Sequence, residues 1–200
     1  MLTLYGDLRS GNCYKVQLML ALLARDYHFQ SVDILNRENR EHEFLAKNPN
    51  GKIPVLGLDD GSYLAESNAI LYYLGRDSIY FPQELRSQAK VMQWLFFEQY
   101  SHEPYIAVAR FIQLYLGLPD SRKEEYAHKQ AGGHKALSLM QSQLLDSPYL
   151  CGDYPSIADI ALYAYTHRAH EGGFDLARYP AIQAWCMRIE SLPGYQPMQC

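Results

Sequence analysis

The first 75 residues alternate between strand-like and helix-like hydrophobic patterns. Met1 to Tyr5 is a short apolar run ended by Gly6 and Asp7, which predicts a strand. From about Cys13, apolar residues recur with helical spacing and predict a helix with one buried face. Two further helices are expected at 39–47 and 67–74, and further strands at 28–33, 54–58 and 63–65. The Asp-Asp-Gly-Ser turn between the last two strands predicts a hairpin, so the expected order is β-α-β-α-β-β-α.

Beyond this region the sequence predicts helices alone. A helical pattern runs from Gln88 to Leu116, with a kink expected at Pro104, which lacks a backbone donor. Further helices are expected around 137–144, 157–164 and 182–189. The predicted fold is therefore α/β plus all-α: a small α/β domain over 1–75, a linker over 76–87 and an all-helical domain over 88–200.

Composition and charge exclude several classes of protein. Apolar residues make up 48% of the 200 residues and charged residues 20%, which is typical of globular chains. The net charge is -4, so neither a nucleic acid nor an anionic membrane is an expected partner. The longest apolar run has seven residues, Leu18 to Ala24, and no secretory signal is recognised. The four cysteines show no pairing or metal-ligand spacing, which favours a cytoplasmic protein with reduced thiols.

Ser10-Gly11-Asn12-Cys13 lies between the first predicted strand and helix. A helix N-terminus presents unpaired N–H groups and partial positive charge, which stabilise a thiolate. Ser10 takes the first cysteine position of a Cys-x-x-Cys motif, so its hydroxyl can donate to a thiolate supplied by a ligand. The alternative is that Ser10 or Asn12 only caps the helix, with Cys13 packed behind as a small buried residue.

Two more segments suggest the binding of a peptide-like ligand. If the Ile53-Pro54 bond is cis, the backbone of Ile53 can pair with an extended ligand; otherwise Pro54 only marks a strand edge. Glu66 and Ser67 lie where a strand passes into a helix N-terminus. Such a site can hold a carboxylate, and Glu66 can accept from an ammonium, although Ser67 can equally be a simple cap.

These segments together resemble the cytosolic glutathione transferase superfamily over nearly the whole chain. The most specific stretches are Asn48–Val55, Glu66–Leu71 and Ser156–Asp159, the last resembling the N-capping box of the family's helical domain. The Ser-x-x-Cys segment resembles the serine-type classes, in a version that looks bacterial. The resemblance implies a thioredoxin-like domain that binds glutathione and a helical domain that lines the acceptor site.

The resemblance also implies a role for individual residues. Ser10 matches the hydroxyl that donates to the glutathione sulfur, and Ile53, before Pro54, matches the residue whose backbone pairs with the cysteinyl unit. Glu66 and Ser67 match the pair that holds the γ-glutamyl group. Lys52 matches a basic residue near the glycyl carboxylate. Asn39 lies near another position that binds this carboxylate in some classes, but the match is poor.

Other residues are weaker candidates. Asn12 is a second candidate for contact with the sulfur, and Tyr5 is a third, near the catalytic tyrosine of other classes. The acceptor pocket is expected to include Tyr105, Ile106 and Arg110. His167 and His170 have no further ligand at metal-site spacing, so no metal is expected.

Three functions remain open on the sequence. The first is conjugation of glutathione, as co-substrate, to a hydrophobic electrophile, the chemistry of detoxification. The second is glutathione-dependent reduction of disulfides or peroxides, and the third is a non-catalytic regulatory or interaction module. A homodimer is expected from the resemblance and from the apolar stretch Val91 to Phe97.

Overall fold

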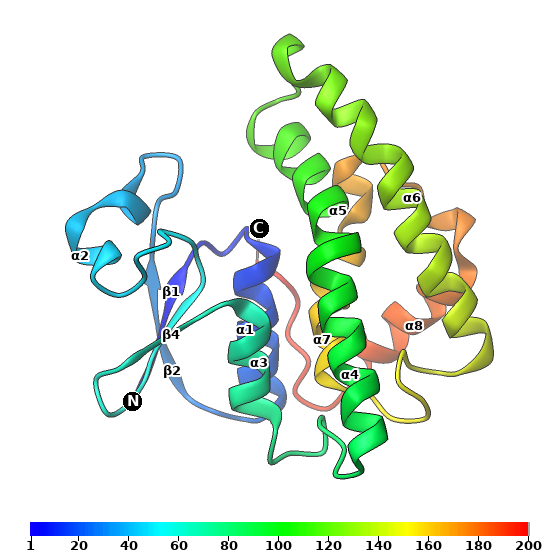
Figure 1. The fold of residues 1–200 in the computed structure, drawn as a ribbon, viewed down its shortest axis with the longest axis horizontal. Coiled ribbons are helices and arrows are strands. Elements are labelled where there is room, and N and C mark those ends of the chain that lie inside the picture. The colour runs from blue at the N-terminus through cyan, green and yellow to red at the C-terminus, as the bar shows by residue number, and fades with distance from the viewer. Residues whose placement is uncertain (200) are drawn as a thin grey trace. The chain divides into compact units, whose positions relative to one another are not determined.

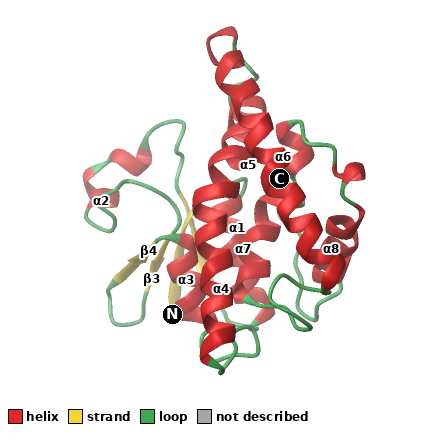
Figure 2. Ribbon diagram, turned by 45° about the vertical axis from the view of Figure 1, so that its right-hand side comes forward, coloured by secondary structure: helices red, strands yellow, loops and turns green. Residues whose placement is uncertain are grey.

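The computed structural model describes residues 1–199, and Figure 1 shows its elements. The chain forms two compact units, residues 1–79 with 192–199, and residues 80–191. All strands of the described chain belong to the first unit (Figure 2). The expected arrangement of a small α/β domain and a helical domain is therefore confirmed.

A four-stranded mixed sheet organises the first unit. Its strands are β1 (Leu2–Gly6), β2 (Tyr27–Ser31), β3 (Val55–Gly57) and β4 (Tyr63–Ala65), in the spatial order β2-β1-β3-β4. β1 and β2 are parallel and are joined through α1 (Gly11–Leu22), whereas β3 pairs antiparallel with both β1 and β4. The expected order of elements is confirmed, and the arrangement is thioredoxin-like.

The two faces of the sheet follow from the alternation of side chains along each strand. Leu4 lies opposite Leu56, and both are fully buried, on the face covered by α1 and by α3 (Ser67–Gly75) (Figure 1). Tyr5 lies opposite Val55 on the other face, in a small core that includes Phe44 of α2 (His42–Leu45). The single helix expected over 39–47 is therefore wrong in detail, because a 3₁₀ turn at 38–40 precedes this short α2.

The last residues of the chain pack on the first unit rather than on the helical one. The Tyr14 hydroxyl of α1 donates to the carbonyl of Gln196 at 2.7 Å. Gly194 lies so close to the end of α1 that an added Cβ would stand 2.9 Å from the carbonyl oxygen of Ala21. The observed units therefore differ from the expected boundaries, which placed this segment with residues 88–200.

The expected kink at Pro104 is a change of helix type in the second unit. α4 (Leu85–Phe97) continues through a π-helical turn at 98–102 into α5 (Glu103–Arg110), and a second π-helical turn follows at 111–115. Pro104 provides no N–H for the carbonyl four residues earlier. The helix therefore changes from α to the wider π geometry before it. The single continuous helix of the sequence pattern is thus four consecutive segments.

The remaining helices are α6 (Lys123–Asp146), α7 (Ile157–Thr166) and α8 (Pro180–Glu190). α7 packs against α4, α5 and α8, and α6 packs against α5 and α8. Every residue of α7 is buried, as in a central helix. The predicted capping box is confirmed: Asp159 accepts from the backbone N–H of Ser156 at 2.9 Å and from the indole N–H of Trp185 at 2.9 Å.

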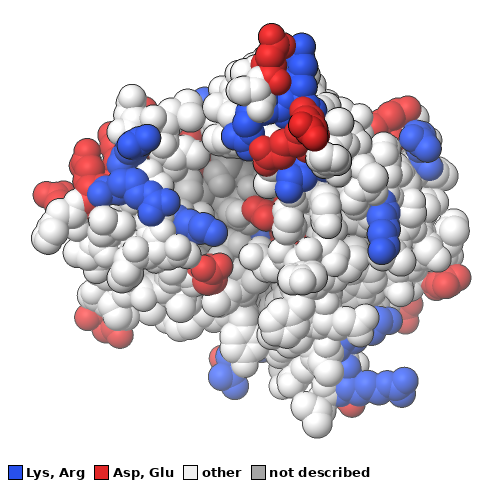
Figure 3. All heavy atoms as spheres, turned by 45° about the horizontal axis from the view of Figure 1, so that its top comes forward, with Lys and Arg blue, Asp and Glu red and all other residues white. Residues whose placement is uncertain are grey.

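Surface charges of both signs alternate around the start of α6. Lys123 pairs with Asp120 at 2.6 Å and Arg122 with Glu125 at 2.6 Å. Figure 3 shows blue and red side chains interleaved at this tip of the second unit. Among the described helices, none combines the length and apolar character needed to cross a bilayer.

Candidate functional site

Ser10 is the N-cap of α1. The backbone N–H of Cys13 donates to its Oγ with an N···O distance of 3.4 Å, and its own N–H donates to the carbonyl of Asp7 at 3.0 Å. A hydroxyl can donate once and accept twice, so capping uses an acceptor position and leaves the O–H for a ligand. The two interpretations of Ser10, helix cap and thiol activator, are therefore compatible.

Cys13 is a packing residue. Its side chain is fully buried, and an added Cβ on Gly6 would stand 2.5 Å from its sulfur. Burial raises the pKa of the Cys13 thiol to about 12. The thiol is therefore un-ionised at neutral pH, and any reactive thiolate at this helix start has to come from a ligand.

A hydrogen-bonded network joins the first turns of α1 and α3. The Ser67 hydroxyl donates to Oδ1 of Asn12 at 3.2 Å, and the ammonium of Lys15 donates to Ser67 Oγ at 3.2 Å and to Asn68 Oδ1 at 3.3 Å. Lys15 and Ser67 are buried. The network brings Asn12, a candidate for thiol contact, next to Ser67, a candidate for γ-glutamyl binding.

Glu66 precedes α3 in a strained conformation. Its φ of 67° and ψ of 109° lie outside the left-handed helical region, which costs a residue with a side chain about 1–3 kcal/mol. Its side chain is exposed and does not cap α3, so the first N–H groups of this helix have no side-chain cap. The Glu66 carboxylate thus lies beside a helix N-terminus. A ligand that carries both an ammonium and a carboxylate needs this combination, because Glu66 suits the ammonium and the helix N-terminus suits the carboxylate.

The Ile53–Pro54 peptide bond is cis, as the resemblance implied. Ile53 is half-buried against the small core of the sheet, and within residues 1–199 neither its N–H nor its C=O has a hydrogen-bond partner. Pro54 is buried, whereas Lys52, on the other side of Ile53, is exposed and its carbonyl accepts from the Asn48 amide at 2.8 Å. The backbone of Ile53 thus has both a donor and an acceptor for an extended ligand.

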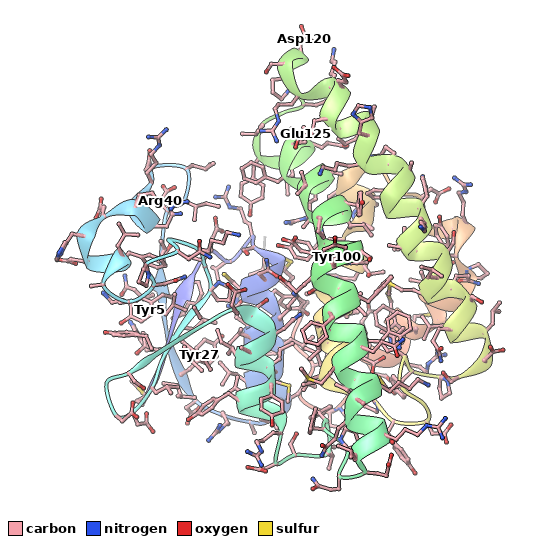
Figure 4. All side chains as sticks on the ribbon, in the orientation of Figure 1. Tyr5, Tyr27, Arg40, Tyr100, Asp120 and Glu125 are labelled. Atoms are coloured by element: carbon pink, nitrogen blue, oxygen red, sulfur yellow. The ribbon has the colours of Figure 1, made fainter. Side chains whose placement is uncertain are left out.

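Asn39 anchors the loop before Pro54. Its amide donates to the carbonyl of Gly51 at 2.7 Å, which is an anchoring contact and a structural reason for its poor match to a carboxylate-binding residue. Arg40, which the sequence pattern did not single out, donates to the carbonyl of Asn50 at 3.2 Å and packs over Gly51. Figure 4 shows Arg40 at the same end of the first unit as α2.

Tyr5 lies on the other face of the sheet from α1 and α3 (Figure 4). Its ring meets Tyr63 edge to face, with centroids 6.2 Å apart, and burial raises the pKa of its hydroxyl. Both observations disfavour Tyr5 as the group that stabilises a thiolate at the start of α1.

The three residues expected at the acceptor pocket have partners within the helical unit. Ile106 is fully buried, and Arg110 is buried in an ion pair with Glu171. The ring of Tyr105 covers Gly132 of α6, where an added Cβ would stand 2.2 Å from ring carbons. All three residues thus contribute to packing within the helical unit, and their place at an acceptor pocket stays a prediction.

Residues 1–199 contain no group of three or more His, Cys, Asp or Glu side chains placed to hold a metal ion. His167, one of the two histidines considered above, has its Nδ1 2.8 Å from the carbonyl of Tyr163. The donors at the predicted site are instead hydroxyl, amide and backbone groups, which suit an organic ligand.

Comparison with known proteins identifies the family. Residues 1–76 match the family model of the glutathione S-transferase N-terminal domain, and residues 123–188 match that of the C-terminal domain. A crystal structure of a glutathione S-transferase from Pseudomonas fluorescens Pf-5 has a TM-score of 0.98 and 61% identity, covering 100% of this chain and 99% of that one. The chain belongs to the glutathione S-transferase family.

Members of the family carry different names. The disulfide-bond oxidoreductase YfcG of Escherichia coli is 31% identical over 92% of this chain and 87% of its own length. Elongation factor 1-gamma of Drosophila melanogaster is 30% identical over 81% of this chain and 37% of its own length. Membership in the glutathione S-transferase family therefore supports a transferase-type enzyme without specifying the reaction.

Sequence reasoning missed Lys15 and Asn68. A signal for Lys15 was present, because it lies four residues before Met19 and so close to the buried face of the first predicted helix. A lysine there is unusual, since lysine is almost never fully buried without partners. Asn68 follows Ser67 directly and carried no periodic signal of its own.

Proposed function

We propose that this chain is a glutathione transferase that ionises the glutathione thiol and conjugates it to a hydrophobic electrophile. The observation that carries the proposal is the 3.2 Å hydrogen bond between Ser67 and Asn12. It places the start of α3, where the γ-glutamyl group would bind, beside the start of α1, where the thiol would bind. One small peptide can then occupy both.

Each part of glutathione has a candidate partner. Glu66 would accept from the γ-glutamyl ammonium, and the start of α3 at Ser67 would hold the α-carboxylate. The backbone of Ile53, which has no partner in the described chain, would pair with the cysteinyl unit. Lys52 would lie near the glycyl carboxylate. Ser10 would donate a hydrogen bond from its hydroxyl to the thiolate sulfur.

The energy required to activate the thiol is within reach of these groups. Lowering a thiol pKa from about 8.5 by two units needs roughly 2.7 kcal/mol of preferential thiolate stabilisation. One hydrogen bond to a charged group supplies about 1.5–3 kcal/mol, and a helix N-terminus adds about 0.3–1 kcal/mol. The thiolate then forms a C–S bond with the electrophilic carbon while the bond to the leaving group breaks, and the thiol proton goes to solvent.

The similarity to a protein named disulfide-bond oxidoreductase favours a second candidate reaction. The glutathione thiolate would attack a disulfide to form a mixed disulfide and release one thiol. A second glutathione would then release the other thiol and leave as glutathione disulfide. Both reactions need the same activated thiolate, so Ser10 and Asn12 serve either one.

Turnover assays separate the candidates. An aryl halide whose conjugate absorbs light tests conjugation, and hydroxyethyl disulfide coupled to glutathione reductase tests reduction. Conjugation well above the uncatalysed rate supports the transferase, and reduction alone supports the alternative. Calorimetric binding of glutathione without either turnover indicates a binding module. Absence of glutathione binding contradicts the proposal altogether.

We infer that the protein acts as a homodimer. The exposed side of α4 and of the π-helical turn after it carries Leu85, Phe96 and Tyr100, the last 86% exposed. Tyr100 is labelled in Figure 4. Such apolar exposure is typical of association surfaces, and a two-fold dimer is the commonest arrangement. Sedimentation equilibrium should give twice the 23.0 kDa chain mass at micromolar concentration. A mass of one chain contradicts the inference.

A further inference from the structure

Lys15 places a cation beside the starts of two helices. It is the fifth helical residue of α1, and its ammonium contacts Ser67 and Asn68, the first two residues of α3. Helix N-termini carry partial positive charge, so a cation near them is disfavoured. The side chain is nevertheless fully buried there. Positions that break local rules in this way are expected at functional sites.

The hydrogen bonds of Lys15 determine those of Ser67. An ammonium can only donate, so Ser67 Oγ must accept from Lys15, at 3.2 Å. The single hydroxyl proton of Ser67 is then directed to Asn12 Oδ1, also at 3.2 Å. Because this proton is engaged, Ser67 offers an incoming carboxylate its backbone N–H, and the positive charge close to that position comes from Lys15.

We propose that Lys15 is a positioning residue for glutathione, coupling γ-glutamyl binding at α3 to thiol activation at α1. Its charge favours the γ-glutamyl α-carboxylate at the start of α3. Its hydrogen bond to Ser67 fixes the orientation of Asn12, two residues after the thiol-activating Ser10. The inference rests on the proposed binding of glutathione and adds Lys15 to the residues that determine ligand specificity.

The test compares Lys15→Met with the wild type and with Lys135→Met. Methionine has a similar length and no charge, and Lys135 is an exposed lysine of α6, so its substitution controls for loss of a charge. We expect Lys15→Met to weaken glutathione binding about tenfold in calorimetry. The control should bind as the wild type does.

A second ligand separates a specific role from a structural one. A glutathione analogue with the γ-glutamyl α-carboxylate converted to carboxamide should bind the wild type more weakly than glutathione does. Lys15→Met should bind the two ligands with nearly equal affinity. General loosening of the fold would instead weaken both ligands in parallel, and that result would overturn the proposal.

Thiol activation gives an independent readout. Titration of thiolate absorbance near 240 nm in the saturated complex should show a higher midpoint for Lys15→Met, with about three- to tenfold less thiolate at the wild-type midpoint. In a Ser67→Ala background, Lys15→Met should no longer shift the midpoint, because the connection to Asn12 is already lost. A shift of undiminished size in that background would overturn the coupling.

A folding failure of Lys15→Met, seen by circular dichroism, does not prevent the test. The coupling then predicts that Asn12→Ala and Ser67→Ala have non-additive effects on the titration midpoint, whereas additive effects contradict it. If the wild type binds no glutathione, the proposed function and this inference both fail. If it binds glutathione and Lys15→Met binds and titrates identically, only this inference fails.

Discussion

Replacing Ser10 by alanine separates the two roles of its hydroxyl. As a helix cap, Ser10 contributes to stability; as a thiol activator, it contributes to the acidity of bound glutathione. The groups proposed to hold the rest of the ligand, Glu66, Ser67 and Ile53, are untouched by the substitution. Binding should therefore change little, while the ionisation of the bound thiol should change substantially.

The structure sets the size of both effects. Substituting an N-cap serine costs about 0.5–2 kcal/mol, and the long 3.4 Å distance from Cys13 N to Ser10 Oγ places this cap near the lower end. Loss of a hydrogen bond to a thiolate costs about 1.5–3 kcal/mol, or roughly one to two pKa units. At neutral pH the thiolate fraction and the turnover should fall about tenfold, and at high pH most of the difference should disappear.

Titration of the bound thiolate near 240 nm, with turnover from pH 5.5 to 9, measures the effect. Glu84→Ala is a matched control, because Glu84 caps α4 by accepting from Arg86 N at 2.8 Å and Ser87 N at 2.7 Å. It should lower the melting temperature without moving the titration midpoint. An unchanged midpoint in Ser10→Ala would show that Ser10 is only a cap and would direct attention to Asn12.

Three further results are expected. Ser67→Ala removes the hydroxyl that connects Lys15 to Asn12 and should weaken glutathione binding about tenfold in calorimetry, and unchanged affinity would contradict the γ-glutamyl assignment. Burial lowers the pKa of His167 to about 4 from its usual 6.5. The unfolded chain then binds the proton more tightly, so stability should fall by about 2–3 kcal/mol as pH drops from 6.5 to 4, and denaturant titrations of His167→Gln should show a smaller fall. Gly132→Ala should destabilise the fold, since overpacking against Tyr105 costs about 1–3 kcal/mol and exceeds the gain in helix propensity of about 1 kcal/mol. In a Tyr105→Ala background the same substitution should stabilise; the same sign in both backgrounds would refute the packing argument.

The hydrophobic pattern predicted the elements of the fold well because each amphipathic segment buries the face that the pattern marks. It failed where the pattern continues across a local change in backbone geometry. The stretch from Gln88 to Leu116 keeps one helical period, yet the structure divides it into α segments and two π-helical turns, the first of which ends two residues before Pro104. The packing of residues 192–199 on the first unit depends on a contact 182 residues away in sequence, between Tyr14 and Gln196, which no local pattern encodes.

The sequence marks candidate site residues only where they lie at recognisable junctions between elements. Ser10, Glu66 and Ser67 were predicted because the sequence marks strand-to-helix junctions, and the structure places all three at such junctions. Lys15 was missed because its hydrogen bonds form only where two helices meet, and sequence spacing describes one helix at a time. Ile106 shows a further ambiguity, since a buried residue on an apolar helix face can belong to a pocket or to a core.

The distribution of broken local rules supports the location of the site. Glu66 has positive φ with a ψ of 109°, whereas Arg37, at φ 63° and ψ 23°, adopts the ordinary left-handed conformation of a turn. α3 begins without a side-chain cap, and Lys15 places a cation where two helices begin. α7, by contrast, begins with a complete capping box at Ser156. The proposed binding of an anionic ligand at the start of α3 would account for these features together, because the ligand supplies negative charge and acceptors to uncapped N–H groups and to an ammonium.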